Sequence, residues 1–270
     1  FSNEDTRLQS DTQINTGYVG SNAYMVFASN SSMTSSSSAA YADTIRLNSS
    51  AQVSNVYANS IDGNTSVISG TQQTVALPVV ATMPNMPELT PNGQEVTVAR
   101  NGGSLLEAGS YGKLKVNRNG SLILSGGVYH FTEWDIVANA EIYASAPVDI
   151  RISGRLRTRG NVTIMPTASG NLTAKDIRIF VNGTNEGDTR EGRPRAAHFG
   201  NDNTLALNIY APNGSVYLGQ RNTAAGAYIG RWAHAGKHTK LSLDSSFGQN
   251  QPIATEVPPP EIAPTNAPVD

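Results

Sequence analysis

The sequence contains no cysteine, few charged or aromatic residues and no long apolar run. The absence of cysteine excludes disulfides, thiolate metal sites and cysteine nucleophiles, and it is compatible with a secreted bacterial protein. Charged residues make up 15% of the chain and the formal net charge is −2. No overall positive charge attracts phosphate polyanions, so we expect no nucleic-acid partner. No apolar segment approaches the roughly 18 residues of a membrane-spanning helix.

Glycine, serine, threonine and asparagine are abundant instead. Serine, threonine and asparagine compete with the hydrogen bonds of a helix backbone, so the composition favours an extracellular, β-rich protein with a polar, uncharged surface. The 270 residues suffice for one or two domains with a substantial core. Because the chain begins at Phe1 rather than methionine, we expect that an upstream signal or anchor was removed, or that the chain was trimmed.

Residues 114–164 repeat their chemistry every twenty residues. The apolar positions one period apart are Val116, Ile136 and Leu156, then Leu122, Ile142 and Val162, and the small residues between them are Gly120, Ala140 and Gly160. A twenty-residue unit with two apolar alternations and a tight corner has the size of one coil of a parallel β-helix. The sequence therefore predicts an all-β fold, a right-handed parallel β-helix (solenoid) with an extended proline-rich C-terminal tail.

The alternation of apolar and polar residues also predicts which side chains point outward. Leu114 and Val116 point inward, as do Leu122 and Leu124. One period apart, the outward column is Lys115, Asp135 and Arg155. Adjacent coils of a parallel stack lie about 4.8 Å apart, where charges that alternate in sign are tolerated and like charges repel. The segment 148–154 returns as residues 175–183 after an insertion near Ser169, which predicts a further coil.

The chain divides into four regions. Residues 1–77 are β-rich, either a separate unit or the first coils of the solenoid, with strands expected at Tyr24–Phe27, Thr44–Leu47, Val53–Tyr57 and Thr65–Ile68 and a loop at 29–40. Residues 78–95 contain four prolines, which predicts an extended connection between two β units or a strap along the outside of one. Residues 96–250 form the parallel β-helix with an insertion at 184–203. Residues 251–270 contain six prolines, typical of polyproline II or disorder.

Several of these motifs resemble a known bacterial surface domain. The matching segments are residues 107–116, 120–131, 209–216, 226–230 and 241–244. They are similar to the β-helical domain that follows the pilin-like helix in type IV pilus assembly proteins of the PilX kind, and that occurs in other secreted adhesin-like proteins. The resemblance covers roughly residues 45–247 and implies a cell-surface or appendage protein without supplying catalytic residues. The chain differs in lacking the hydrophobic amino-terminal helix and in having the insertion and the proline tail.

No constellation of residues predicts a reaction, and we expect no catalytic, cofactor or metal site. His234 and His238 have a metal-like spacing, but a zinc site needs further ligands and Asp244 is the only nearby acid, so a turn or interface pair is favoured. Eight Asn-x-Ser/Thr triplets leave glycosylation open. The two acidic clusters, residues 186–191 and the surroundings of Asp202, leave a calcium loop open beside an ordinary turn.

Carbohydrate cleavage is the enzymatic alternative, because parallel β-helices include polysaccharide lyases. Glycoside hydrolysis needs paired carboxylates, whereas the predicted columns place Asp135 beside basic residues. Arg155, Arg157 and Arg159 form a basic patch that suits a uronate, although a solvated face is the commoner meaning of such a pattern.

The predicted function is a structural subunit of an extracellular filament, sheath or surface appendage, and not an enzyme. The expected partners are copies of itself, bound through the β-helix ends and the extended termini. The candidate assembly contacts are Phe1, Thr16, Gln251, Val257, Pro258, Pro259, Pro260 and Ile262. The alternative is a surface adhesin that binds polysaccharide, with Tyr143, Tyr217 and Trp232 as the candidate glycan-stacking residues. A polysaccharide lyase is the third class.

Overall fold

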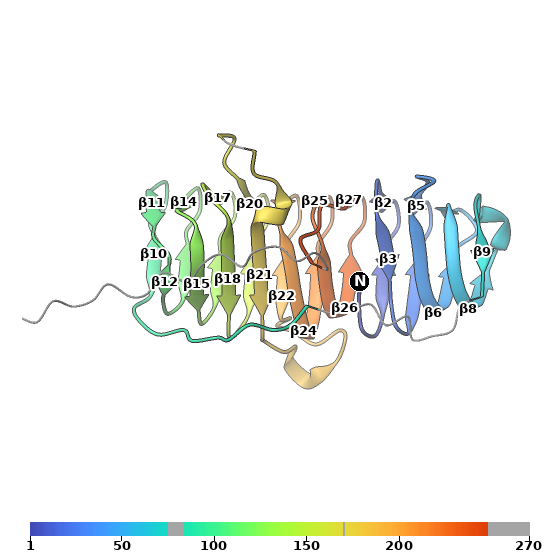
Figure 1. Ribbon diagram of the computed structural model, residues 1–270, viewed down its shortest axis with the longest axis horizontal. Helices are drawn as coiled ribbons and strands as arrows, with labels where there is room; N and C mark the ends of the chain where they lie inside the picture. Colours follow the sequence, from blue (N-terminus) through green and yellow to red (C-terminus); the bar gives the residue numbers. More distant parts are fainter. Residues whose placement is uncertain (75–83, 170, 248–270) are drawn as a thin grey trace, which may run out of the picture.

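The computed structural model is a β-solenoid of eleven coils built almost entirely from parallel strands (Figure 1). It describes residues 1–74, 84–169 and 171–247. Each coil has three sides, and in four coils the third strand continues without a break into the first strand of the next coil. The first and third strands form a 17-stranded sheet and the second strands form a 10-stranded sheet. The parallel β-helix predicted from the twenty-residue repeat is therefore confirmed.

Seven coils follow chain order from residue 96 to residue 243, and we call them the C-terminal block. Coil 1 consists of β10 (Val96–Val98), β11 (Gly103–Leu106) and β12 (Gly109–Ser110). Coil 2 consists of β13 (Leu114–Val116), β14 (Ser121–Leu124) and β15 (Gly127–Phe131). Coil 3 consists of β16 (Trp134–Ile136), β17 (Glu141–Ala144) and β18 (Val148–Ile152). Coils 4 and 5 consist of β19 (Leu156–Thr158), β20 (Thr163–Pro166) and β21 (Ile177–Val181), then β22 (Ala197–Phe199), β23 (Thr204–Ala206) and the first half of β24 (Asn208–Leu218). Coil 6 is the rest of β24, β25 (Thr223–Ala225) and the first half of β26 (Tyr228–Ala235), and coil 7 is the rest of β26 with β27 (Lys240–Ser242).

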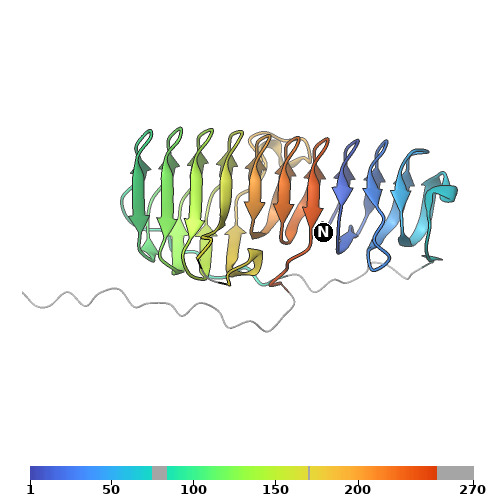
Figure 2. The same cartoon turned by 90° about the horizontal axis from the view of Figure 1, so that it is seen from above.

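The N-terminal residues continue this stack beyond coil 7, and we call residues 1–73 the N-terminal block. Coil 8 consists of β1 (Thr6–Leu8), β2 (Gln13–Ile14) and β3 (Tyr18–Gly20), and coil 9 of β4 (Tyr24–Phe27), β5 (Ser32–Met33) and the first half of β6 (Ala39–Leu47). Coil 10 consists of the rest of β6, β7 (Gln52–Val53) and the first half of β8 (Asn55–Gly63). Coil 11 consists of the rest of β8, η1 (Thr65–Val67) and β9 (Gln72–Gln73). Figure 2 shows the chain start in the middle of the rod. Residues 1–73 therefore belong to the solenoid and are not a separate unit, but in space they form coils 8 to 11 rather than its first coils.

The described part of the proline-containing connection, residues 84–95, runs along the outside of the C-terminal block to coil 1 (Figure 1). In this part the Thr90 N–H donates to Nδ1 of His130 at 3.0 Å, and the Ser110 hydroxyl donates to the Thr90 carbonyl at 2.6 Å. Nη1 of Arg151 donates to the Glu88 carbonyl at 3.3 Å. The segment is thus both a connection between two β units and a strap, as the prolines predicted, and we call residues 84–95 the strap.

The inward positions are the predicted ones. Leu114, Val116 and Leu122 are fully buried, and so are Ile136 and Leu156. The register, however, is not a constant twenty residues. Leu114 pairs with Trp134, as expected, but Trp134 pairs with Leu156, which lies 22 residues further on.

Two corners of coil 3 explain the change of register. Each corner, at residues 145–147 and 153–155, has one residue more than the matching corner of coil 2. The column of Val116 and Ile136 consequently continues with Thr158, and the column of Leu122 and Ile142 continues with Ile164.

The outward column changes with the register, because Lys115 and Asp135 are followed by Arg157 instead of Arg155. The alternation of charge survives, carried by a different arginine. Arg155 instead donates from Nε to the Thr184 carbonyl at 3.0 Å.

The repeat of segment 148–154 in 175–183 is likewise displaced by two residues. Asp149 pairs with Arg178 instead of Asp176, so unlike charges meet across the strands. Nη2 of Arg178 donates to Oδ2 of Asp149 at 2.9 Å and its Nε donates to Oδ1. Asp149 is 2% exposed, and a bidentate guanidinium is the partner that a buried carboxylate requires.

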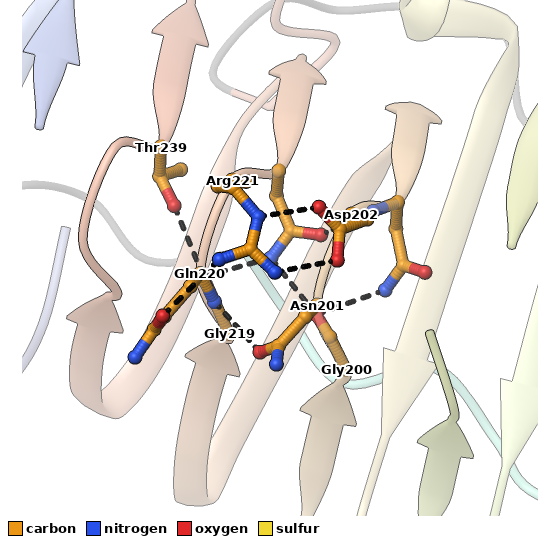
Figure 3. A network of polar contacts seen from close by, with 9 residues as sticks. Gly200, Asn201, Asp202, Gly219, Gln220, Arg221 and Thr239 are labelled. Carbon is orange, nitrogen blue, oxygen red and sulfur yellow. Dashed lines mark hydrogen bonds and ion pairs between the residues drawn. The ribbon is translucent and has the colours of Figure 1, made fainter. Parts of the chain in front are cut away.

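One corner of the coil has a left-handed backbone almost throughout the stack. Asn119, Asn139 and Asn161 occupy it with φ between 57° and 61°, a conformation that asparagine tolerates better than most residues. Nδ2 of Asn139 donates to Oδ1 of Asn119 at 3.2 Å, and Asn161 donates to Asn139 at 2.9 Å. Further along, Arg221 donates to both oxygens of Asp202 in the same corner (Figure 3). The residue after this corner is Gly120, then Ala140, then Val162, so the predicted column of small residues ends at Ala140 and Gly160 does not belong to it.

Three further expectations need correction. Residues 65–68 were expected as a strand, but Thr65–Val67 form the 3-10 helix η1 because the Asn64 side chain accepts from the Ser66 N–H at 3.0 Å. The predicted loop 29–40 contains β5 and the start of β6. The insertion 184–203 is shorter than expected, since β22 and the residues that follow it belong to coil 5. The other 3-10 helices, η2 (Ala174–Asp176) and η3 (Glu186–Asp188), lie in the two insertions, and no helix in the described part is long and apolar enough to cross a membrane.

Candidate functional site at the junction of the two blocks

The interface between coil 7 and coil 8 joins the two blocks, and we call it the junction. β1 lies between β26 and β4, with Arg7 opposite His234, and β2 pairs with β27, with Gln13 opposite Lys240. Main-chain bonds cross it on both sheets, as from the Gln13 N–H to the Thr239 carbonyl at 2.8 Å. The four-coil block is thereby held on the seven-coil block by ordinary parallel β pairing.

Coil 7 takes its third side from the other end of the chain. After β27 the chain leaves the stack, and Ser2 bridges Gly230 of coil 6 and Ser21 of coil 8 in place of a third strand. The Phe1 amino group donates to the Tyr228 carbonyl at 2.9 Å. The Phe1 ring lies over Gly20, where a Cβ would meet ring atoms at 2.0 Å. The C-terminal block is therefore completed by residues of the N-terminal block.

The apolar core is divided at the same place. Among the described residues, one buried cluster comprises side chains between residues 98 and 224, and a second comprises residues 8–58 with Ala235. Leu241 is partly buried against both clusters. A pocket of about 370 Å³, partly open to solvent, lies at the division, lined by Leu8 and Ile14 on one side and Leu218 on the other. The two blocks therefore have separate cores, and apolar packing between them is incomplete.

A row of ring and guanidinium side chains crosses the junction on the outside of the rod. His198, Tyr217, His234 and Arg7 are successive register partners in coils 5 to 8. The Tyr217 ring stacks on His234 at 4.5 Å and meets His198 edge to face at 5.0 Å. The Arg195 guanidinium lies 3.7 Å from the centre of the Tyr217 ring, close enough for a cation–π contact.

Residues 184–195, which we call the clasp, form a loop over this row. The Asn185 side chain anchors the clasp on the C-terminal block: it donates to the Ser215 hydroxyl at 2.7 Å and accepts from the Ser215 N–H at 2.9 Å. Asn185 is 2% exposed. At the tip, Arg190 is ion-paired with Asp5 of the N-terminal block. The clasp therefore holds both blocks at once.

A second ion pair crosses the junction beside the clasp. Nε of Arg231 in β26 lies 2.7 Å from Oε1 of Glu4, and its Nη1 pairs with Asp188 of the clasp. In the Arg190–Asp5 and Arg231–Glu4 pairs the arginine belongs to the C-terminal block and the carboxylate to the N-terminal block. Such complementarity selects a partner and a register more than it adds affinity.

The environment of the row keeps its histidines neutral. Burial lowers the pKa of His198 from 6.5 to about 4, and the cations of Arg195, Arg157 and Arg193 contribute to this lowering. A charged imidazole would be poorly solvated beside these arginines, so His198 is uncharged at neutral pH.

His234 has the same behaviour for the same reason. Burial lowers its pKa from 6.5 to about 4. The cations of Arg195, Arg7 and Arg190 favour the neutral ring, and the carboxylate of Glu191 opposes them.

The three candidate glycan-stacking residues do not come together. Tyr217 lies between two histidines and under Arg195. Trp232 is 6% exposed, with the Arg231 guanidinium 4.2 Å from its ring. Tyr143 lies on the other sheet, in β17. An arginine guanidinium thus covers one face of the Tyr217 ring and one face of the Trp232 ring, and glycan stacking at the three residues stays a prediction.

Among the candidate assembly contacts, Phe1 and Thr16 lie at the junction. Phe1 completes coil 7, and the Thr16 hydroxyl accepts from the Leu243 N–H at 3.1 Å. The strands of residues 1–16 are paired on both sides within the chain, so only their exposed side chains are available to a neighbour. Gln251, Val257, Pro258, Pro259, Pro260 and Ile262 lie outside the described residues.

The histidines and acids considered for metal binding have other contacts. His234 points into the ring row, whereas His238 lies at an exposed corner with Nδ1 3.8 Å from Oδ2 of Asp11. Asp188 and Asp202 are paired with arginines. In the part of the chain that the structure describes, no three potential ligands gather around one point. Arg155, Arg157 and Arg159 have separate surroundings rather than one patch, with Arg157 in the outward column and Arg155 bound to the clasp.

The junction was not predicted from the sequence. Its ion pairs join residues 185 and 227 positions apart, and no local pattern marks them. The available signal was the row itself, since His198, Tyr217 and His234 are spaced by 19 and 17 residues, close to one coil.

No family model, no curated protein and no solved structure matches the chain, so its similarity to the PilX-like surface domain stays a prediction.

Proposed function

We propose that the protein is a structural subunit of an extracellular filament, sheath or surface appendage, and that copies of it associate through the solenoid. The observation that carries this proposal is the free strand edge of coil 1. β11 begins the 10-stranded sheet and, among the described residues, pairs only with β14. Unpaired edge groups of this kind template association with another chain.

The direction of the edge amides can be assigned from the ladder. The Ser121 N–H donates to the Gly102 carbonyl at 2.8 Å and the Ser125 N–H donates to the Leu106 carbonyl at 3.1 Å. Because parallel strands alternate their bonding direction, the amides of Gly103 and Leu105 face away from coil 2. These two donors are available to a strand of a second copy.

Apolar side chains accompany this edge. Leu105 is 62% exposed, and its register partner Ile123 is 38% exposed. Tyr143 continues the same outward column in β17. Exposed apolar groups next to unpaired strand edges are characteristic of association surfaces.

Proline at Leu105 tests the proposal. Leu105→Pro removes an amide that faces the free edge, so the fold is retained while association is lost. Ser104→Pro is the matched control, since the Ser104 amide faces coil 2 and its loss destabilises the solenoid. Electron microscopy and light scattering measure association, and circular dichroism measures the fold. Unchanged filaments or oligomers of Leu105→Pro would count against assembly through this edge.

A further inference from the structure

The order of the coils in space differs from their order in the chain. The N-terminal block precedes the C-terminal block in sequence but stacks after it, on coil 7 (Figure 2). The junction is therefore non-covalent, and residues 74–95 provide the covalent connection between the blocks, from coil 11 back to coil 1.

The length of this connection leaves slack in the closed arrangement, so the connection does not itself hold the N-terminal block on its own coil 7. Coils 11 and 1 are separated by ten spacings of about 4.8 Å, or about 48 Å. The 22 residues of the connection reach about 73 Å when fully extended. The contacts of Glu88 and Thr90 are with Arg151, His130 and Ser110, all in the C-terminal block, so the strap keeps its site if the N-terminal block leaves.

We propose that the junction binds a second copy of this chain, by exchange of the N-terminal block. Coils 8 to 11 of one copy stack on coil 7 of the preceding copy and make the contacts that they make within one chain. In this arrangement the N-terminal block of a donor is joined to its own C-terminal block only by the connection, which no longer has to run the length of one rod. The inference rests on the proposed assembly function only for the choice of partner.

Three features of the junction support the exchange. The two blocks have separate cores with a pocket between them, so apolar packing across the junction is less complete than within either block. Coil 7 lacks a third side until residues 1–3 of a donor supply it. The clasp pairs Arg190 with Asp5, and Arg231 beside it pairs with Glu4, so an acceptor recognises the acidic start of a donor. Because every contact already exists in the closed form, exchange requires no new surface, as in other domain-swapped proteins.

Concentration selects between the two forms. A flexible connection holds the N-terminal block near its own coil 7 at an effective concentration in the millimolar range. The closed form is therefore favoured in dilute solution, and the exchanged form is favoured when copies are crowded or when the connection is too short to close.

Cysteine pairs can detect exchange directly, because the chain has no cysteine of its own. Gln13 and Lys240 are exposed register partners across the junction. We would mix full-length Gln13→Cys protein with full-length Lys240→Cys protein, unfold and refold them together at high concentration, oxidise them and run a non-reducing gel. Exchange predicts a shift from the one-chain band to a two-chain band, since the cysteines meet only when different copies share a junction.

Thr204→Cys mixed with Thr223→Cys is the control. These residues are exposed register partners within the C-terminal block and are not expected to meet between copies. One-chain bands alone in the Gln13 and Lys240 mixture would overturn the inference, and so would equal two-chain bands in both mixtures, which would indicate random collision. If filaments form although the two-chain product is absent, assembly through the edge of coil 1 is supported and exchange at the junction is overturned.

Shortening the connection provides a second test. Deletion of residues 75–83 leaves 13 residues that reach about 43 Å, less than the closed form needs. Light scattering should then show loss of the monomer in favour of larger species. A control in which nine glycine and serine residues replace 75–83 should keep the monomer. A deleted protein that is monomeric with an unchanged circular dichroism spectrum would overturn the inference.

Discussion

Mild acid should destabilise the protein through the two histidines that flank Tyr217. The folded state lowers the pKa of both His198 and His234 from 6.5 to about 4, mainly by burial. The unfolded chain therefore takes up protons as the pH falls through 6.5, while the folded protein takes them up only near pH 4. The unfolded state binds more protons in this window, so the free energy of unfolding decreases as the pH falls.

The size of the effect follows from the two pKa values. At pH 5 a histidine whose pKa is lowered this far would cost about 2 kcal/mol relative to pH 7.5. Both rings are partly exposed, so solvent screening reduces this to about 1 kcal/mol each, or about 2 kcal/mol for the pair. The groups facing the rings contribute through their charges: Arg157, Arg193 and Arg195 around His198, and Arg7, Arg190, Arg195 and Glu191 around His234.

Urea denaturation at pH 7.5, 6 and 5 measures this difference. The comparison protein is the double variant His198→Gln and His234→Gln, which cannot titrate at these positions. We expect the wild type to lose about 2 kcal/mol more than the double variant between pH 7.5 and pH 5. An equal loss in the two proteins would refute the reasoning, because the pH dependence would then come from other groups.

Three substitutions test the packing and polar contacts of the solenoid by urea denaturation. Arg178→Gln leaves the buried carboxylate of Asp149 without its bidentate partner and should cost about 3 kcal/mol, against less than about 0.5 kcal/mol for the exposed Arg118→Gln; equal losses would contradict this. Asn139→Val places a β-branched residue at a φ of 61° and should cost about 2 kcal/mol, whereas Asn139→Gly should cost less, and the reverse order would be inconsistent with strain at this corner. Leu122→Ala removes a fully buried side chain and should cost about 3 kcal/mol, so a loss below about 1 kcal/mol would mean that the core collapses around it.

The fold could be predicted because successive coils repeat the same chemistry, but the register between coils could be predicted only up to coil 3. Alternation identified Leu114, Val116 and Leu122 as inward, and these side chains are fully buried. The twenty-residue period failed in coil 3, where two corners each gained one residue without any change in the apolar pattern of the strands. A corner insertion shifts which residues stack, as with Arg157 in place of Arg155, yet it leaves each strand looking the same in sequence.

The spatial order of the coils was beyond the reach of the sequence for a different reason. The strands of coil 8 and coil 1 have similar short apolar alternations, and either could stack on coil 7 by the same main-chain bonds. The choice depends on long-range contacts such as Arg231 with Glu4 and on Phe1 completing coil 7. Proline content did indicate an extended strap, because proline excludes regular pairing wherever it occurs.

The position of Phe1 in the middle of the rod has a mechanical consequence. Phe1 lies beside coil 7, and the chain leaves the stack from that coil after Leu243 (Figure 2). Tension applied between these two points would load the hydrogen bonds of one seam, while the remaining coils on either side would carry almost no force. The rod would part at that seam into two intact pieces still joined covalently through residues 74–95, and it would close again when the force was removed.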